Sequence, residues 1–285
     1  MKKLLFLLDT DPFPSVFDTV VGYDGGADHV AGYAKLTPDN VGPLVDGTIF
    51  TRGGKDKQYT AIFVGGGDMA KGEALFRAVK KKFFGPFRVS IMLDANGSNT
   101  TAAAGVALLA KAKPLAGKKV VVLAGTGPVG MRAAALLGKE GAEVSLTSRS
   151  KARADAAAKA IEARFGVSPK PIEAADDAAR AKAIKGAQIV FAAGAIGCQL
   201  LQKAAWESEA SIEMLADVNA QPPLGIEGIE ATDKGKERAG KLAFGALGIG
   251  GLKLKLHRGC IGQLFESSEQ VFDAEEIYAL AKAMA

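Results

Sequence analysis

The segment VVVLAGTGPVGMRAAALL, residues 120–137, constrains the fold of this chain most strongly. Its Gly-x-Gly-x-x-Gly motif, formed by Gly125, Gly127 and Gly130, follows a run of apolar residues and precedes a helical pattern. In dinucleotide-binding βαβ units the first glycine allows a tight turn, the second admits the pyrophosphate, and the third lets the helix pack on the strand. The helix N-terminus then offers N–H groups to the phosphates. Because of these flanks, the motif predicts a Rossmann-type dinucleotide-binding domain rather than a glycine turn without a ligand.

The end of the following strand indicates which dinucleotide is bound. Many NAD-binding chains carry Asp or Glu there, to bind the ribose hydroxyls. Here the strand AEVSLTSR ends in Ser148 and Arg149, and Lys151 and Arg153 follow. A guanidinium matches phosphate oxygens, whereas a carboxylate would repel them. The pattern therefore predicts NADP, with Arg149 as the first choice for the 2′-phosphate contact; the alternative is an ordinary solvated loop.

Two later strands also end in residues that suit this ligand. One ends in the small residues Ala192, Ala193 and Gly194, which leave room for a ligand crossing the carboxyl ends of the strands. The next ends in Asp217 and Asn219, which we expect on the nicotinamide side. The predicted cofactor-binding residues are Gly125, Thr126, Gly127, Pro128, Val129, Gly130, Ser148, Arg149, Lys151, Arg153, Ala193, Asp217 and Asn219.

The first hundred residues predict a second α/β unit. The segments KLLFLLD, YTAIFVGGGD and FRVSIMLD are typical of buried strands, and MAKGEALFRAVKKKFF has apolar residues at helical spacing. Strands that alternate with helices indicate a largely parallel sheet. The polar segment 94–101 then leads into an alanine-rich helix, which is a natural connection between domains. We therefore predict an α/β protein with a Rossmann-type NADP domain and a smaller α/β domain.

Several classes of protein are disfavoured by the remaining features. Cys198 and Cys260 lack CxxC spacing, which fits reduced thiols in the cytosol. His29 and His257 have no neighbouring ligands at metal-site spacing, so no metal is predicted. The N-terminal apolar run is too short for a signal peptide, and no segment has the length of a membrane span. The net charge of +5 comes from scattered residues, which argues against a nucleic-acid surface.

Long and unusual stretches of the chain resemble a known family. These stretches are LFLLDTDPFPSVFD, VVGYDGGADH, AIFVGGGDM, FFGPFRVS, LDANGSNTTAAAG, LAGTGPVGMRAAALL, DVNAQPPLGI, ATDKGKE and FGALGIGGLKLKLHR. They are similar to the bacterial NADP-dependent methylene-tetrahydromethanopterin dehydrogenases of methylotrophs, which also accept methylene-tetrahydrofolate. The resemblance runs over essentially the whole chain.

The resemblance implies a domain plan and a cellular setting. It implies a pterin-binding domain of residues 1–99 plus 268–285 and an NADP-binding domain of residues 100–267, flanking a cleft. It also implies a cytoplasmic homo-oligomer, a trimer in the type member, that takes part in formaldehyde oxidation. The expected partner is a small pterin substrate, with no nucleic acid and no membrane.

The resemblance also suggests site residues. Thr101 and Lys253 are the expected catalytic residues, acting by orienting the substrate; a helix-capping hydroxyl and a solvated helix lysine are the alternatives. Lys255, two residues on and on another face of the helix, is the natural control. Carboxylates and amides suit the amino and amide groups of a pterin edge. The predicted substrate-binding residues are Asp18, Asp94, Asn96, Ser98, Thr101 and Lys253.

The expected chemistry is hydride loss from a methylene group between two nitrogens. The nitrogen lone pairs stabilise the resulting methenyl cation, so no general base is required and positioning dominates. Two other interpretations stay open: a different two-domain dehydrogenase, such as a shikimate-type enzyme, and a non-catalytic NADP(H)-binding sensor. Tyr278 and Lys282 have the spacing of a YxxxK motif, but the helical period of the last segment explains them as packing. The same motif spacing occurs in bifunctional folate dehydrogenase/cyclohydrolases. Whether this chain has cyclohydrolase activity stays open, although residues 1–99 contain no YxxxK motif, which argues against it.

Overall fold

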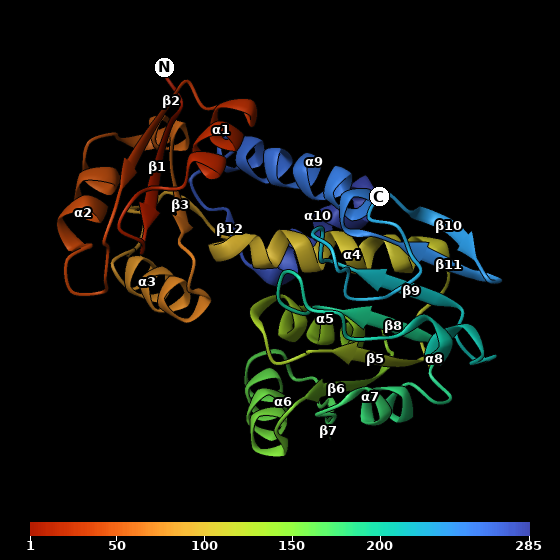
Figure 1. Ribbon diagram of the computed structural model, residues 1–285. Helices are drawn as coiled ribbons and strands as arrows, with labels where there is room; N and C mark the ends of the chain where they lie inside the picture. Colours follow the sequence, from red (N-terminus) through yellow and green to blue (C-terminus); the bar gives the residue numbers. More distant parts are fainter. The chain divides into compact units, whose positions relative to one another are not determined.

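The structure is a computed structural model that describes residues 1–285, and the chain divides into two compact units (Figure 1). Unit 1 comprises Met1–Thr100 and Leu254–Leu280, and unit 2 comprises Thr101–Lys253 and Ala281–Ala285. Each unit is built on its own largely parallel sheet with helices packed on it. The predicted fold class, two α/β domains of which one is Rossmann-type, is confirmed.

Unit 1 contains a five-stranded parallel sheet with the order β12-β4-β3-β1-β2. The central strands β3 and β4 are buried along their whole length, which explains their continuous apolar sequences. β12 joins the sheet from the far end of the chain, with Val271 opposite Ile91. The strands are β1 (Leu4–Asp9), β2 (His29–Tyr33), β3 (Thr60–Gly65), β4 (Ser90–Leu93) and β12 (Val271–Phe272).

The helices of unit 1 cover this sheet and close an apolar core. Leu75 of α3 packs in one cluster with strand residues that include Val64 and Ile91. Asp68 caps α3 by accepting hydrogen bonds from the N–H groups of Ala70 and Lys71. The helices are α1 (Val16–Asp24), α2 (Gly42–Phe50), α3 (Met69–Lys81) and most of α10 (Ala274–Met284), and short 3-10 turns span Gly54–Tyr59 and Ala95–Gly97.

Unit 2 contains a seven-stranded sheet with the order β10-β11-β9-β8-β5-β6-β7, in which only β10 is antiparallel. The chain starts in the middle at β5, moves outward through β6 and β7, and then returns to β8 on the other side. This reversal between β5 and β8 is the topological switch point at which doubly wound folds bind ligands. The strands are β5 (Lys119–Leu123), β6 (Glu143–Ser148), β7 (Lys170–Glu173), β8 (Ile189–Ala192), β9 (Met214–Asp217), β10 (Lys234–Arg238) and β11 (Lys241–Phe244).

Helices pack on both faces of this second sheet. Trp206 of α8 and Ile184 at the end of α7 share a core cluster with Val121 and Leu215, whereas Gly105 of α4 packs against Phe191. The helices are α4 (Ser98–Ala112), α5 (Pro128–Lys139), α6 (Lys151–Phe165), α7 (Asp177–Ala183), α8 (Lys203–Glu207) and α9 (Ala246–Leu264). None of the helices is long and apolar enough to cross a membrane.

The second half of α9 belongs to unit 1, because the chain returns to this unit at Leu254. The sequence predicts this return later, at residue 268. The reason is packing against α1: a Cβ added to Gly25 would lie 2.6 Å from Cβ of Ile261. In addition, Arg258 forms an ion pair with Asp24 at 2.7 Å. The chain therefore changes units inside a continuous helix.

Candidate functional site

The glycine turn after β5 is shaped as its three glycines predict. A Cβ at Gly125 would lie 2.7 Å from Cβ of Leu146, and one at Gly130 would lie 2.8 Å from Cα of Gly125. At these two positions the neighbouring protein atoms leave no room for a ligand. A Cβ at Gly127, in contrast, would have only the carbonyl oxygen of Ala124 within 4 Å, at 3.9 Å. The open side of the turn is therefore at Gly127, where a pyrophosphate would approach the backbone.

The end of β6 holds this turn in place. Ala124, which has a positive φ of 52°, donates its N–H to Oγ1 of Thr147 at 3.1 Å. Gly125 donates its N–H to the carbonyl oxygen of Thr147 at 2.9 Å. Thr147 is not among the residues predicted from the sequence, although it is a hydroxyl residue that directly precedes the proposed ribose-binding pair. The end of β6, which carries the predicted ribose-binding pair, and the glycine turn are thus joined by two hydrogen bonds.

Replacing Thr147 with valine should remove the side-chain bond while keeping the shape of the side chain. Thr147 is buried, so the N–H of Ala124 would lose its partner, at a cost of about 1–3 kcal/mol in the free energy of unfolding. Urea denaturation and the KM for NADP measure the two effects. Thr147→Ser keeps the hydroxyl and is the matched control. If the valine variant is as stable as the serine variant, the hydroxyl is not what fixes the turn.

The four residues expected at the ribose differ in exposure and in their partners. Ser148 is buried, and its hydroxyl accepts a long bond of 3.4 Å from the N–H of Ser150. Lys151 forms an ion pair with Asp155 one turn further along α6. Arg149 and Arg153 are exposed. Because the charge of Lys151 already has a partner, Arg149 remains the first choice for a 2′-phosphate contact.

The residues expected at the ends of β8 and β9 shape the loops that follow these strands. Ala193 donates its N–H to the carbonyl oxygen of Leu123 at 3.0 Å and so ties the end of β8 to β5. The buried carboxylate of Asp217 accepts bonds from the N–H groups of Asn219 and Ile226 at 3.0 and 2.9 Å. Burial raises the pKa of Asp217 despite these bonds. The carboxylate oxygens of Asp217 thus stabilise the loop after β9 by accepting hydrogen bonds from it.

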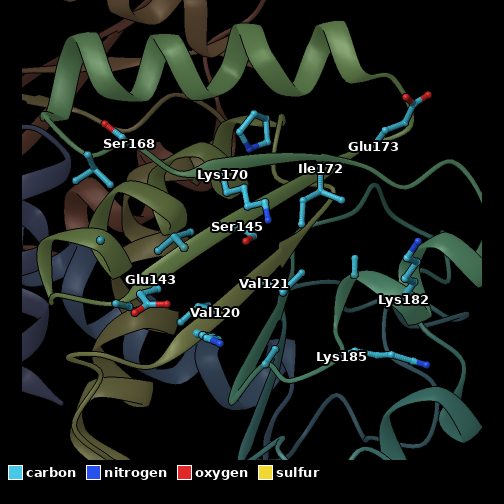
Figure 2. A pocket seen from close by; sticks show the side chains of 18 of the residues that line it. Val120, Val121, Glu143, Ser145, Ser168, Lys170, Ile172, Glu173, Lys182 and Lys185 are labelled. Carbon is cyan, nitrogen blue, oxygen red and sulfur yellow. The ribbon is translucent and has the colours of Figure 1, made fainter.

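Unit 2 also has a groove on the sheet face formed by β5, β6 and β7 (Figure 2). Its volume is about 1270 Å³, and Ser145, Ile172 and Lys182 are among the residues that line it. The glycine turn and Arg149 do not line it; of the expected cofactor residues only Lys151 does. This groove is therefore separate from the dinucleotide site at the carboxyl ends of the strands.

In unit 1, the predicted substrate residues gather where β3 and β4 end. A Cβ added to Gly65 would lie 3.5 Å from Oδ2 of Asp18, which is half-buried on α1. Asn96 is exposed and donates its N–H to the carbonyl oxygen of Gly66 at 2.6 Å. Its φ of 55° is a left-handed conformation that asparagine tolerates better than most residues. Asp18 and Asn96 can thus offer a carboxylate and an amide at the same edge of the sheet.

Asp94 and Ser98 lie beneath this edge and are fully buried. The carboxylate of Asp94 accepts bonds from the N–H groups of Asn99 and Thr100, at 2.8 and 3.0 Å, and from the hydroxyl of Thr100, at 2.6 Å. Asp94 is therefore the cap of α4. Since this carboxylate accepts bonds from two N–H groups of the first turn, α4 has a side-chain cap other than the hydroxyl of Thr101.

Thr101 and Lys253 each lie inside a helix and are half-buried. Thr101 is the fourth residue of α4, and Lys253 is in the middle of α9. Lys255, the control position, is exposed. Thr101 lies beyond the first residue of α4, and the assignment of both residues as catalytic stays a prediction.

Comparisons with known proteins agree with this division of the chain. The family described as methylene-tetrahydromethanopterin dehydrogenase, N-terminal, matches residues 16–96, and an NAD(P)-binding family matches residues 114–225. The chain is 30% identical to an NAD(P)-dependent methylenetetrahydromethanopterin dehydrogenase of Methylorubrum extorquens, over 100% of this chain and 99% of the relative. The chain belongs to the methylenetetrahydromethanopterin dehydrogenase family.

A second relative from the same organism is more similar. The bifunctional protein MdtA of Methylorubrum extorquens is 72% identical, over 100% of this chain and 99% of that protein. Among solved structures, a 5-ketofructose reductase of Gluconobacter shares the fold, with a TM-score of 0.53 and 16% identity over 100% of this chain and 99% of that one. Within the dehydrogenase family, the matched N-terminal segment contains Asp18, Asp94 and Asn96, and the matched NAD(P)-binding segment contains the glycine turn and Arg149.

Proposed function

We propose that this protein transfers a hydride from methylene-tetrahydromethanopterin, and also from methylene-tetrahydrofolate, to NADP. The product is the methenyl cation, and the process is one-carbon oxidation from formaldehyde. The observation that carries the proposal is the full-length similarity to a named methylenetetrahydromethanopterin dehydrogenase, combined with a glycine turn whose open side is at Gly127. Unit 1 would bind the pterin, and unit 2 would bind NADP.

The residues of unit 2 fit NADP. The turn at Gly125 and Gly130 is closed by packing, whereas Gly127 leaves space for phosphate oxygens. α5 begins at Pro128, directly after Gly127, so the free N–H groups of its first turn lie next to this turn and could bind phosphate oxygens. Arg149 would bind the 2′-phosphate, which makes NADP the preferred cofactor over NAD. When bound, NADP supplies nicotinamide C4 as the hydride acceptor.

The remaining work of the protein is to bind and orient the substrate. Hydride loss releases no proton, because the nitrogen lone pairs neighbouring the methylene carbon stabilise the cation. Lys253 and Thr101 would therefore act by donating hydrogen bonds that hold the pterin in one orientation. Asp18 and Asn96 would bind the amino and amide groups of the pterin edge. Exclusion of water would protect the methenyl product from hydrolysis.

We also propose a cellular setting, which rests on the family resemblance alone. The protein would work in the cytoplasm as a homo-oligomer, a trimer by resemblance to the type member. Its partners would be small molecules, without nucleic acid, membrane or metal. Size-exclusion chromatography with light scattering would measure the assembly, and a monomeric mass would contradict this part of the proposal.

Turnover separates this function from a non-catalytic NADP(H) sensor. The purified protein is mixed with NADP and either methylene-tetrahydromethanopterin or methylene-tetrahydrofolate, and absorbance in the NADPH band is recorded. NADP reduction with at least one carrier is the expected result. Binding of NADPH without reduction in the presence of either carrier would favour the sensor and overturn the proposal.

A further inference from the structure

A buried histidine of unit 1 has no role in the chemistry described so far. His257 lies on α9 with its side chain enclosed. Its ring stacks on Phe63 of β3, with centroids 5.3 Å apart, and lies 6.2 Å from the ring of Phe17 on α1. Its Nδ1 lies 3.9 Å from Oδ2 of Asp94. Side chains from β3, α1 and the loop after β4 thus converge on one imidazole.

Apolar packing alone does not explain why this buried position holds a histidine. Burying a polar ring costs free energy unless it interacts with other polar groups, and an aliphatic side chain would fill the same apolar surroundings without that cost. The buried carboxylate of Asp94 is one polar group beside it. Burial raises the pKa of the Cys260 thiol, and the charge of Asp94 raises it further. The carboxylate of Asp94 therefore also affects the next turn of α9.

Asp94 connects this histidine to the start of α4. The carboxylate binds the N–H groups of Asn99 and Thr100, and Thr101 is the next residue of the helix. On α9, His257 lies four residues after Lys253, which places both on the same face one turn apart. The contact between His257 and Asp94 therefore joins the two helical turns adjacent to the two proposed catalytic residues.

We infer that His257 is a positioning residue: its imidazole holds the carboxylate of Asp94 and thereby fixes the turns that carry Thr101 and Lys253. The role rests on the proposed function. His257 does not accept a proton from the substrate, because hydride transfer releases none. What it supplies is a polar contact between α9 and the cap of α4 that an apolar side chain of similar size would not make.

Two substitutions separate positioning from packing. His257→Gln keeps a polar side chain at this position, whereas His257→Leu fills the space with apolar atoms. Because burying an amide costs more than burying an aliphatic chain, the leucine variant should have a melting temperature at least as high as that of the glutamine variant. Turnover should show the opposite order. The leucine variant should lose about tenfold in kcat, and the glutamine variant should lose less.

The experiment measures kcat, the KM for methylene-tetrahydromethanopterin, the KM for NADP and the melting temperature of wild type and both variants. The KM for NADP should stay at the wild-type value, since the contacts of His257 lie in unit 1. His29→Gln, at the exposed second histidine, is the matched control and should behave as wild type.

Each outcome decides between the two roles. If the leucine variant turns over as fast as the glutamine variant, or if both raise the KM for NADP as much as that for the pterin, His257 is a packing residue. Wild-type protein without turnover would overturn the proposed function and this role together. If the wild type turns over but the kcat values of the two variants follow the order of their melting temperatures, only the positioning role of His257 is overturned.

Discussion

Replacing Lys253 with alanine is expected to lower kcat by about hundredfold, the size of effect that follows when a reacting group is misplaced by about 1 Å. Lys253 is half-buried on α9, and its ammonium group would orient the pterin. Because the proposed role is orientation and not proton transfer, the loss should be similar across the pH range in which the protein is stable. The KM for NADP should change little. Steady-state NADPH formation at several pH values measures all of these quantities.

Lys255→Ala is the matched control for this prediction. Lys255 is the same residue type on the same helix, two residues further along, and its side chain is exposed. Residues two apart on a helix do not share a face, so the control should retain nearly all of its turnover. Two alanine variants that both behave as wild type would refute the assignment of Lys253. Equal losses in both would point to a general effect on α9.

Replacing Arg149 with alanine should raise the KM for NADP roughly tenfold to hundredfold. Hydrogen bonds between charged groups contribute about 1.5–3 kcal/mol, and 1.4 kcal/mol corresponds to a factor of ten. Arg149 is exposed at the end of β6, beside the glycine turn that Thr147 holds. NAD has no 2′-phosphate, so the KM for NAD should change much less. The ratio of the two kcat/KM values therefore measures cofactor selection directly.

Lys151→Ala provides the comparison for Arg149. Lys151 carries the same charge near the same strand end, but it is paired with Asp155 and lines the separate groove on the sheet. Its removal should alter the KM for NADP only through the weak field of an exposed charge. Equal changes in the KM for NADP and for NAD in the Arg149 variant would mean that this arginine does not contact the 2′-phosphate.

The interior strands of both sheets could be predicted from the sequence, whereas several edge strands could not. β3 and β4 are buried on both faces, so their sequences are continuous apolar runs. β2 has one buried residue among five, and β7 is the four-residue segment KPIE without any buried side chain. Such strands form because an exposed sheet edge is available for pairing. The local sequence of such a strand contains little information about the sheet edge with which it pairs.

The shape of the glycine turn was more predictable than the surroundings of the proposed substrate residues. The roles of Gly125, Gly127 and Gly130 depend on local backbone geometry, which a short motif specifies. The surroundings of His257 depend on Phe17, Phe63 and Asp94, which only the tertiary fold brings together. Asp94 illustrates the limit of motif-based reasoning. A carboxylate expected to bind pterin is buried and caps α4.

The most direct test of the central claim is to follow both products of one reaction. The wild-type protein is given methylene-tetrahydromethanopterin and NADP, and the formation of NADPH and of the methenyl product is recorded at the same time. Hydride transfer predicts that the two products appear in equal amounts and at equal rates, and that NAD supports a slower reaction. Failure to form NADPH, or NADPH formation without the methenyl product, would contradict the account.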